Sequence, residues 1–148
     1  MKIINKSQNV AKILPNYEKL LKLAMSFSEK EIVRKAKVSL VDFEAGNSEA
    51  RNQGMESEVV GMSWPTGEVM IVIPEMVRIY PVTYKPFKRI LPTTFHNYAE
   101  EFTYTVLHES RHLYQYFVKD HRNPEWDADN YASLMLPLLK SYGHFDGN

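Results

Sequence analysis

One stretch of the chain constrains the fold more than any other. Residues 102–118 contain neither glycine nor proline. Large apolar side chains recur along this stretch at roughly helical spacing, at Phe102, Val106, Leu113 and Phe117. The pattern predicts one long buried helix, which we expect to extend from about residue 96 to about residue 119.

A five-residue motif, His108-Glu-Ser-Arg-His112, lies inside this predicted helix and reads H-E-x-x-H. Residues four apart on a helix share a face, with their Cβ atoms about 5–6 Å apart. Two imidazoles at this spacing can therefore reach one metal ion. Glu109 follows the first histidine, and from there its carboxylate can reach a water on that metal. The motif predicts a zinc site with a general base beside it.

Catalytic zinc keeps three protein ligands and one open position, and the chain offers two candidates for the third ligand. Pro124, with Asn123 as its cap, predicts the start of a second helix that carries Glu125. His121, in the polar linker before that helix, is the alternative. We favour Glu125, because a helix holds a ligand more rigidly than a linker does.

Further polar residues are candidates for supporting roles around this site. Asp129 lies four residues after Glu125 and is expected to accept a hydrogen bond from the far ring nitrogen of a ligand histidine. Arg111 is interpreted as an ion-pairing group rather than a substrate contact. Arg111, Tyr131 and His144 are nevertheless candidate donors to a developing oxyanion, and the sequence does not single one out.

The segment Glu125-Trp-Asp-Ala-Asp-Asn-Tyr-Ala-Ser-Leu-Met-Leu-Pro137 gives a more specific resemblance. Together with the upstream motif it resembles the ImmA/IrrE-type minimal zincins, which pair H-E-x-x-H with E-x-E-A-N-x-F-A-x-x-L-L-M-P. That family belongs to the gluzincins, and the resemblance covers residues 102–137. It implies that His108, His112 and Glu125 are the zinc ligands. It also implies that Glu109 is the catalytic base and that Asp129 supports a ligand histidine.

The chain departs from the family pattern in three places. Arg111 stands where the family usually has glycine, and Tyr131 where it usually has phenylalanine. The run from Ala132 to Pro137 is also one residue shorter. We expect an arginine at position 111 to change the groove beside the metal, so the family's substrate preference is not carried over.

These observations predict a zinc metallopeptidase that hydrolyses peptide bonds in a protein or peptide substrate, with a metal-bound water activated by Glu109. The resemblance implies regulatory proteins as substrates or partners, including phage or mobile-element repressors. The alternative is a catalytically silent zinc-binding interaction or regulatory module, in which a closed fourth position makes the metal inert. Zinc is the default ion, with manganese, cobalt or nickel as substitutes in vitro.

Composition bounds the partners and the location. The net charge is +0, with a pI near 7.0, so we expect no nucleic-acid partner, and a DNA-associated protease of the same clan is disfavoured. There are 0 cysteines, which is compatible with a cytoplasmic protein. No signal peptide and no run of 18 apolar residues stands out, so we expect no membrane association.

The predicted fold is a single α+β domain over residues 1–148, with N-terminal helices, a small antiparallel sheet, the metal helix and a closing helix. The N-terminal helices are expected over residues 15–26, beginning as early as Gln8, and from a capping box at residues 28–31 to about Lys37. A strand at residues 38–43 and a loop at residues 46–54 follow.

Residues 58–64 and 68–73 are then predicted to form a β-hairpin that ends at Pro74. Residues 77–95 are predicted to be an aromatic loop, either packed over the sheet or forming a wall of the cleft. Pro137 is expected to end or kink the closing helix, before a tail with Gly143 and Gly147. In minimal gluzincins an edge strand beside the metal helix pairs with extended substrate, and residues 68–73 are our candidate.

Overall fold

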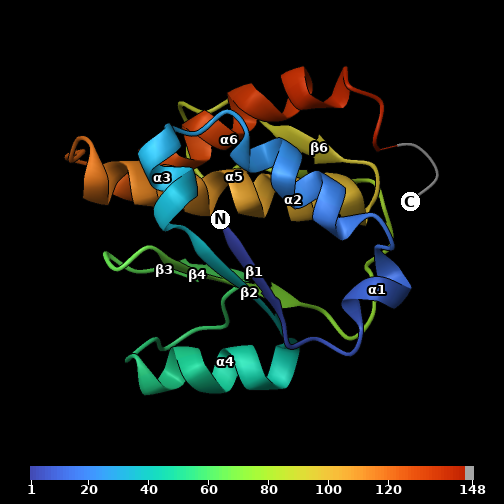
Figure 1. Ribbon diagram of the computed structural model, residues 1–148. Helices are drawn as coiled ribbons and strands as arrows, with labels where there is room; N and C mark the ends of the chain where they lie inside the picture. The colour runs from blue at the N-terminus through green and yellow to red at the C-terminus, as the bar shows by residue number, and fades with distance from the viewer. Residues whose placement is uncertain (146–148) are drawn as a thin grey trace.

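Figure 1 shows a computed structural model of the protein, which describes residues 1–145; Gly147 of the predicted tail lies outside them. The fold is α+β. The elements in chain order are β1 (Lys2–Asn5), α1 (Val10–Ile13), α2 (Tyr17–Met25), α3 (Lys30–Lys35), β2 (Lys37–Asp42), α4 (Phe43–Asn52), β3 (Gly61–Ser63), β4 (Glu68–Ile73), β5 (Val82–Tyr84), β6 (Thr93–Phe95), α5 (Tyr98–Phe117) and α6 (Pro124–Lys140).

The main sheet is mixed, so the prediction of a small antiparallel sheet is confirmed only for its hairpin and is wrong for the rest of the sheet. Its strand order is β1-β2-β4-β3, in which β1–β2 and β2–β4 are parallel and only the hairpin β3–β4 is antiparallel. Strand β1, which has only four residues, was not predicted. Parallel pairing of β1 with β2 requires a long crossover, which α1, α2 and α3 supply. A separate antiparallel pair joins β5 to β6.

The strand at residues 68–73 is not the edge strand that was predicted. It is β4, which pairs with β2 on one side and β3 on the other. Its residues from Val69 to Ile73 are all buried, as expected of a strand covered on both faces. The edge of the sheet beside α5 is instead β3. The strand ends at Ile73, as the following Pro74 predicted.

Helices cover both faces of the sheet (Figure 1), with α4 on one face and α2, α5 and α6 on the other. The predicted loop at residues 46–54 is largely helix α4. The residues Gly46 and Asn47, which suggested a turn, make tertiary contacts in this helix instead. Asn47 accepts a hydrogen bond from the backbone N–H of Val59 at 2.8 Å. Gly46 lets the helix approach the sheet: a Cβ atom there would lie 2.7 Å from Val72 Cγ2 and 2.9 Å from Val41 Cγ2.

Three predicted helix boundaries also differ. The N-terminal helix divides at Pro15 into α1 and α2. Helix α3 begins at Lys30 with Glu29 as its N-cap and without a side-chain cap bond, so the predicted capping box does not form. Pro137 does not end α6, which continues to Lys140.

The predicted metal helix is confirmed as α5, which the Asn97 side chain caps by accepting a hydrogen bond from Glu100 N at 3.0 Å. Phe102, Leu107 and Leu113 are fully buried on the face that packs against α2 and α6. This packing leaves the opposite face of α5 turned toward β3. None of the helices within residues 1–145 is long and apolar enough to cross a membrane.

We predict that Gly46→Ala destabilises the protein, although alanine normally stabilises a helix by about 1 kcal/mol relative to glycine. The added methyl group must displace Val72 and Val41, and such overpacking costs about 1–3 kcal/mol. Chemical denaturation measures the free energy of unfolding. Ser48→Ala, on the exposed side of α4, is the control and should change stability little. A Gly46→Ala protein more stable than the parent would contradict the packing of α4.

Candidate metal centre

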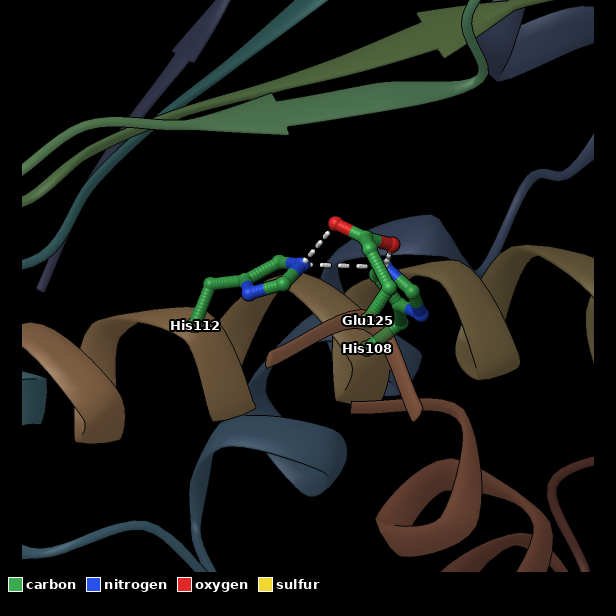
Figure 2. A group of neighbouring side chains, drawn as sticks. All are labelled: His108, His112 and Glu125. Atoms are coloured by element: carbon green, nitrogen blue, oxygen red, sulfur yellow. Dashed lines mark hydrogen bonds and ion pairs between the residues drawn. The ribbon is translucent and has the colours of Figure 1, made fainter. Parts of the chain in front are cut away.

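Three side chains from two helices converge at one point (Figure 2). His108 and His112 project from α5, and their Nε2 atoms lie 3.1 Å apart. Glu125, in the first turn of α6, places Oε1 2.9 Å from Nε2 of His112 and Oε2 3.2 Å from Nε2 of His108. The structure therefore brings together the residues that the sequence predicted as metal ligands.

The opposite ring nitrogens decide which atoms of the histidines face this point. Nδ1 of His108 lies 3.0 Å from Asp129 Oδ1, and Nδ1 of His112 lies 2.8 Å from Gln115 Oε1. Both partners are acceptors, so each Nδ1 donates a proton in the neutral ring. Both Nε2 atoms then direct lone pairs at each other and at a carboxylate. Such an arrangement needs protons or a cation between the three groups.

The donor set fits a zinc ion. Two imidazole nitrogens and one carboxylate oxygen are ligands that zinc accepts, and three protein ligands leave a fourth position open. Ligands about 2.0–2.1 Å from a tetrahedral ion lie about 3.3 Å from one another. The separations of 2.9, 3.1 and 3.2 Å are within a few tenths of an ångström of that value. Small side-chain rotations would therefore complete the site.

His121, the alternative third ligand, lies outside this group. Its Nδ1 accepts a hydrogen bond from Asn123 N at 2.9 Å, and its ring stacks on Trp126 with centroids 6.1 Å apart. The nearest carboxylate to its Nε2 is Asp127, at 3.9 Å. These contacts turn His121 toward the start of α6 rather than toward His108 and His112.

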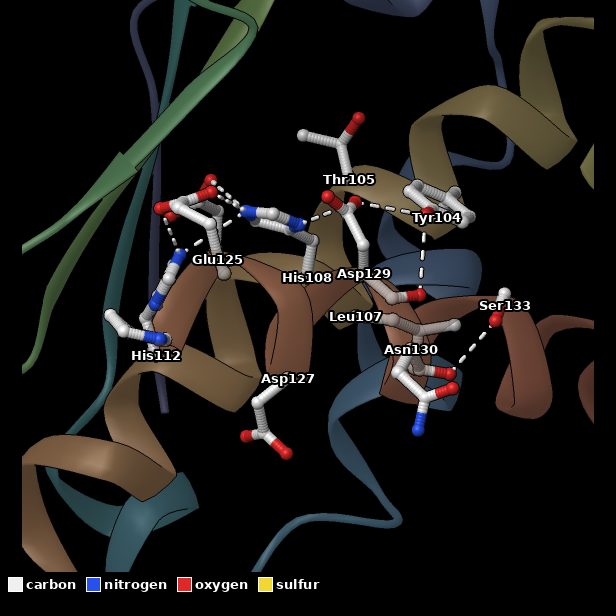
Figure 3. A network of polar contacts seen from close by, with 12 residues as sticks. Tyr104, Thr105, Leu107, His108, His112, Glu125, Asp127, Asp129, Asn130 and Ser133 are labelled. Atoms are coloured by element: carbon white, nitrogen blue, oxygen red, sulfur yellow. Dashed lines mark hydrogen bonds and ion pairs between the residues drawn. The ribbon is translucent and has the colours of Figure 1, made fainter. Parts of the chain in front are cut away.

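Asp129 supports His108 as the sequence suggested (Figure 3). It is buried, and its Oδ1 also accepts a hydrogen bond from the Tyr104 hydroxyl at 2.9 Å. Tyr104 comes from the same face of α5 as His108, so the two helices are joined on this side by a carboxylate with two donors. This arrangement restricts the imidazole to one rotamer and one tautomer.

A second support, around His112, was not predicted. The amide nitrogen of Gln115 donates to Pro124 O at 2.9 Å and to Asp127 Oδ2 at 3.0 Å, so its oxygen must face His112. Asp127 in turn accepts from Arg111 Nε at 2.7 Å. The signal in the sequence was the position of Gln115, three residues after His112 and therefore on the same helix face. Its polar partners come from a distant segment, which the sequence does not indicate.

The prediction that Arg111 is an ion-pairing group is confirmed, and its expected effect on the groove is wrong. Besides its bond to Asp127, its guanidinium lies 4.1 Å from the ring centroid of Tyr114 and 5.2 Å from that of Tyr131. These contacts hold its guanidinium among Asp127, Tyr114 and Tyr131, and Arg111 does not line the cleft described below. Tyr131 and His144, the other candidate oxyanion donors, do not line that cleft either.

Glu109 is almost completely buried, 4% exposed, and its Oε2 lies 4.0 Å from Nε2 of His108. Burial raises the pKa of this carboxyl group, against the influence of His108 and His112. Gly61 of β3 allows the close approach, because a Cβ atom there would lie 2.9 Å from Glu109 Oε2. The carboxylate is thus held between the edge strand and the histidines.

These groups open into a cleft of about 580 Å³ between α5, β3 and the start of α6. Tyr84 and Phe95 line it, so part of the aromatic segment at residues 77–95 forms a wall of the cleft. Tyr84 also packs edge-on against Tyr104, with centroids 5.5 Å apart. Tyr116, four residues beyond His112, lines the other end.

The carboxylates set the protonation of the histidines in the metal-free protein. Burial by itself would lower the pKa of His108, but hydrogen bonds to Asp129 and Glu125 outweigh it and raise the pKa to about 10. The pKa of His112 is also raised, against burial, mainly by its hydrogen bond to Glu125. The same bonds to His108 and His112 lower the pKa of Glu125.

Comparison of this chain with protein-family models, with characterised proteins and with solved structures finds no significant match.

We predict that Gln115→Ala weakens zinc binding about 10- to 100-fold, because the ring of His112 loses the acceptor that holds its tautomer. Competition with a chromophoric chelator measures the affinity. Gln53→Ala is the matched control, since the side chain of Gln53 hydrogen-bonds only to the exposed Glu49 among the described residues. Equal zinc affinities for the Gln115→Ala protein and the parent would contradict a supporting role for this amide.

We also predict that zinc affinity rises with pH from about 6 to about 9, since a metal must displace protons from its ligands. The raised pKa keeps His108 protonated in the metal-free protein at neutral pH. The protonated His108 stabilises the folded metal-free protein fully at pH values below 6.5, the ordinary pKa of histidine. This stabilisation is lost as the pH rises through about 10. Calorimetry in buffers of different ionisation enthalpy measures the protons released. An affinity that is constant above pH 6.5 would contradict this charge state.

Proposed function

We propose that this protein is a zinc-dependent metallopeptidase of the minimal gluzincin type, with His108, His112 and Glu125 as the metal ligands and Glu109 as the catalytic base. One observation carries the proposal: a buried carboxylate with a raised pKa lies 4.0 Å from a converging His-His-Glu group, inside an open cleft. A purely structural metal site has no need of such a carboxylate.

Zinc held by these ligands supplies Lewis acidity, which polarises a carbonyl group and brings the pKa of water close to neutrality. Glu109 accepts a proton from the attacking water and delivers it to the leaving nitrogen as the peptide bond breaks, first as a general base and then as a general acid. A buried carboxylate with a raised pKa suits both steps, because a pKa closer to neutral pH lets the group both accept and release a proton.

Tyr116 is our candidate for stabilising the negative charge that develops on the carbonyl oxygen. It lies on α5 one turn beyond His112 and lines the cleft, and its hydroxyl donates to Ser63 O at 3.4 Å. Burial raises the pKa of this hydroxyl, so it remains a hydrogen-bond donor at neutral and mildly alkaline pH. It replaces the three donor candidates considered from the sequence.

The edge strand that we propose for substrate pairing is β3 rather than β4. The residues of β3, Gly61 to Ser63, line the cleft. Strand β4 pairs with one edge of β3, and β3 lies at the end of the sheet. An extended peptide can pair with the other edge through backbone hydrogen bonds. Such pairing would bring a scissile bond past Glu109, because Gly61 lies directly against that carboxylate.

We predict that Glu109→Gln keeps zinc and loses cleavage, with kcat falling about 100- to 10,000-fold as the proton carrier is removed. The assay is digestion of a degenerate peptide library by the zinc-loaded protein, followed by mass spectrometry, with zinc content measured on the same samples. Glu44→Gln, on the exposed side of α4, is the control and should cleave like the parent. A Glu109→Gln protein that cleaves at the parent's rate would exclude the proposed mechanism.

A further inference from the structure

The cleft contains a single permanent cation of its own. Among the described residues that line it, Arg78 is the only lysine or arginine, whereas five are acidic: Glu58, Glu101, Glu109, Glu125 and Asp129. A negatively charged group on a bound peptide is therefore repelled by the carboxylates that line the cleft, and apart from the metal group Arg78 is the one permanently charged side chain among the described lining residues that attracts it.

Arg78 is held in one orientation by contacts on its inner edge. Its Nε lies 3.2 Å from both carboxylate oxygens of Glu101, and its Nη2 donates to the same carboxylate. Tyr80 also donates to Glu101, at 2.6 Å, and so shares the charge of that carboxylate. The guanidinium is thus oriented before any ligand arrives, as an effective binding group requires.

The outer edge of the guanidinium remains available. The Arg78 side chain is 52% exposed, and within residues 1–145 its hydrogen-bond partners are confined to Glu101. Glu101 itself is only 16% exposed. Its carboxylate occupies the edge of the guanidinium formed by Nε and Nη2, so the edge formed by Nη1 and Nη2 is the one left for a second carboxylate in the cleft that Arg78 lines. Arginine recognises carboxylates with two parallel hydrogen bonds from such an edge.

Helix α5 sets the spacing between Glu101, which holds this arginine, and the first histidine of the metal group. Glu101 precedes His108 by seven residues, two helical turns along the same face, which corresponds to about 10 Å. Thr105 lines the cleft between them. An extended peptide covers this distance in about three residues.

We propose that Arg78 forms a carboxylate-binding subsite that selects peptides with a negative charge about three residues from the cleaved bond. This inference rests on the proposed peptidase function. The carboxylate can come from an aspartate or glutamate side chain or from the C-terminus of the peptide, since both offer the same two oxygens to the guanidinium.

Digestion of a degenerate peptide library by the zinc-loaded parent provides the first part of the test. Acidic residues, or chain ends, should be enriched at one position about three residues from the cleaved bond. Arg78→Gln should abolish this enrichment, and Arg78→Lys should retain part of it. Arg89→Gln removes the same charge from an exposed residue that does not line the cleft, and should cleave like the parent.

A binding measurement separates this subsite from catalysis. In the Glu109→Gln background, fluorescence anisotropy compares three versions of the best library peptide: amidated with glutamate at the selected position, amidated with glutamine there, and ending there in a free carboxylate. At least one of the two carboxylate versions should bind about 10-fold more tightly than the glutamine version, which is the size of effect that a hydrogen bond to a charged group allows. The glutamate and free-end versions distinguish a side-chain source from a chain terminus.

The outcomes distinguish the two proposals. Cleavage by the parent without acidic enrichment, or a preference that survives Arg78→Gln, would overturn the subsite and leave the peptidase function intact. If the parent, like the Glu109→Gln protein, cleaves no peptide of the library, the peptidase function is overturned and the subsite with it. Loss of the preference in Arg78→Gln alone supports both.

Discussion

The packing of α6 against α5 determines where the chemistry of this protein can occur. Helix α5 alone places His108 and His112 on one face, but their Nε2 atoms would then only repel each other. The first turn of α6 adds Glu125 between them, 2.9 and 3.2 Å from the two nitrogens. A buried apolar interface that includes Leu113 and Leu136 holds the helices in this register. The site therefore depends on the core of the domain.

The two acidic residues that follow Glu125 secure the same register from either side. Asp129 reaches His108 and Tyr104, while Asp127 reaches Arg111 and Gln115, the residue that orients His112. One short segment of α6 thus supplies a candidate metal ligand and both supporting carboxylates. Because each carboxylate bonds two residues of α5, a shift of α6 along α5 would break four contacts at once. We infer that this coupling keeps the two rings aimed at one point in the absence of metal.

The two histidines could be placed on one face from the sequence because their geometry is local: residues four apart on a helix share a face. The helix start at Pro124 indicated Glu125 as their partner. Strand order is not local, so the mixed sheet, the short strand β1 and the edge position of β3 could not be predicted. Gly46 and Asn47 suggested a loop because glycine and asparagine are turn formers. Only tertiary contacts explain their place in a helix: Gly46 packs closely against Val72, and Asn47 accepts a hydrogen bond from Val59 N. The role of Gln115 required partners on α6, which its spacing from His112 does not indicate.

The central claim is that three side chains from α5 and α6 bind one metal ion. Zinc content after saturation and exhaustive dialysis tests it most directly, measured on the parent and on a His112→Ala variant that retains the parent's helical circular dichroism. We expect about one zinc per chain in the parent and almost none in the variant, because one lost ligand leaves too few donors to hold the ion. A parent without zinc, or a variant that retains the parent's full content, would contradict it.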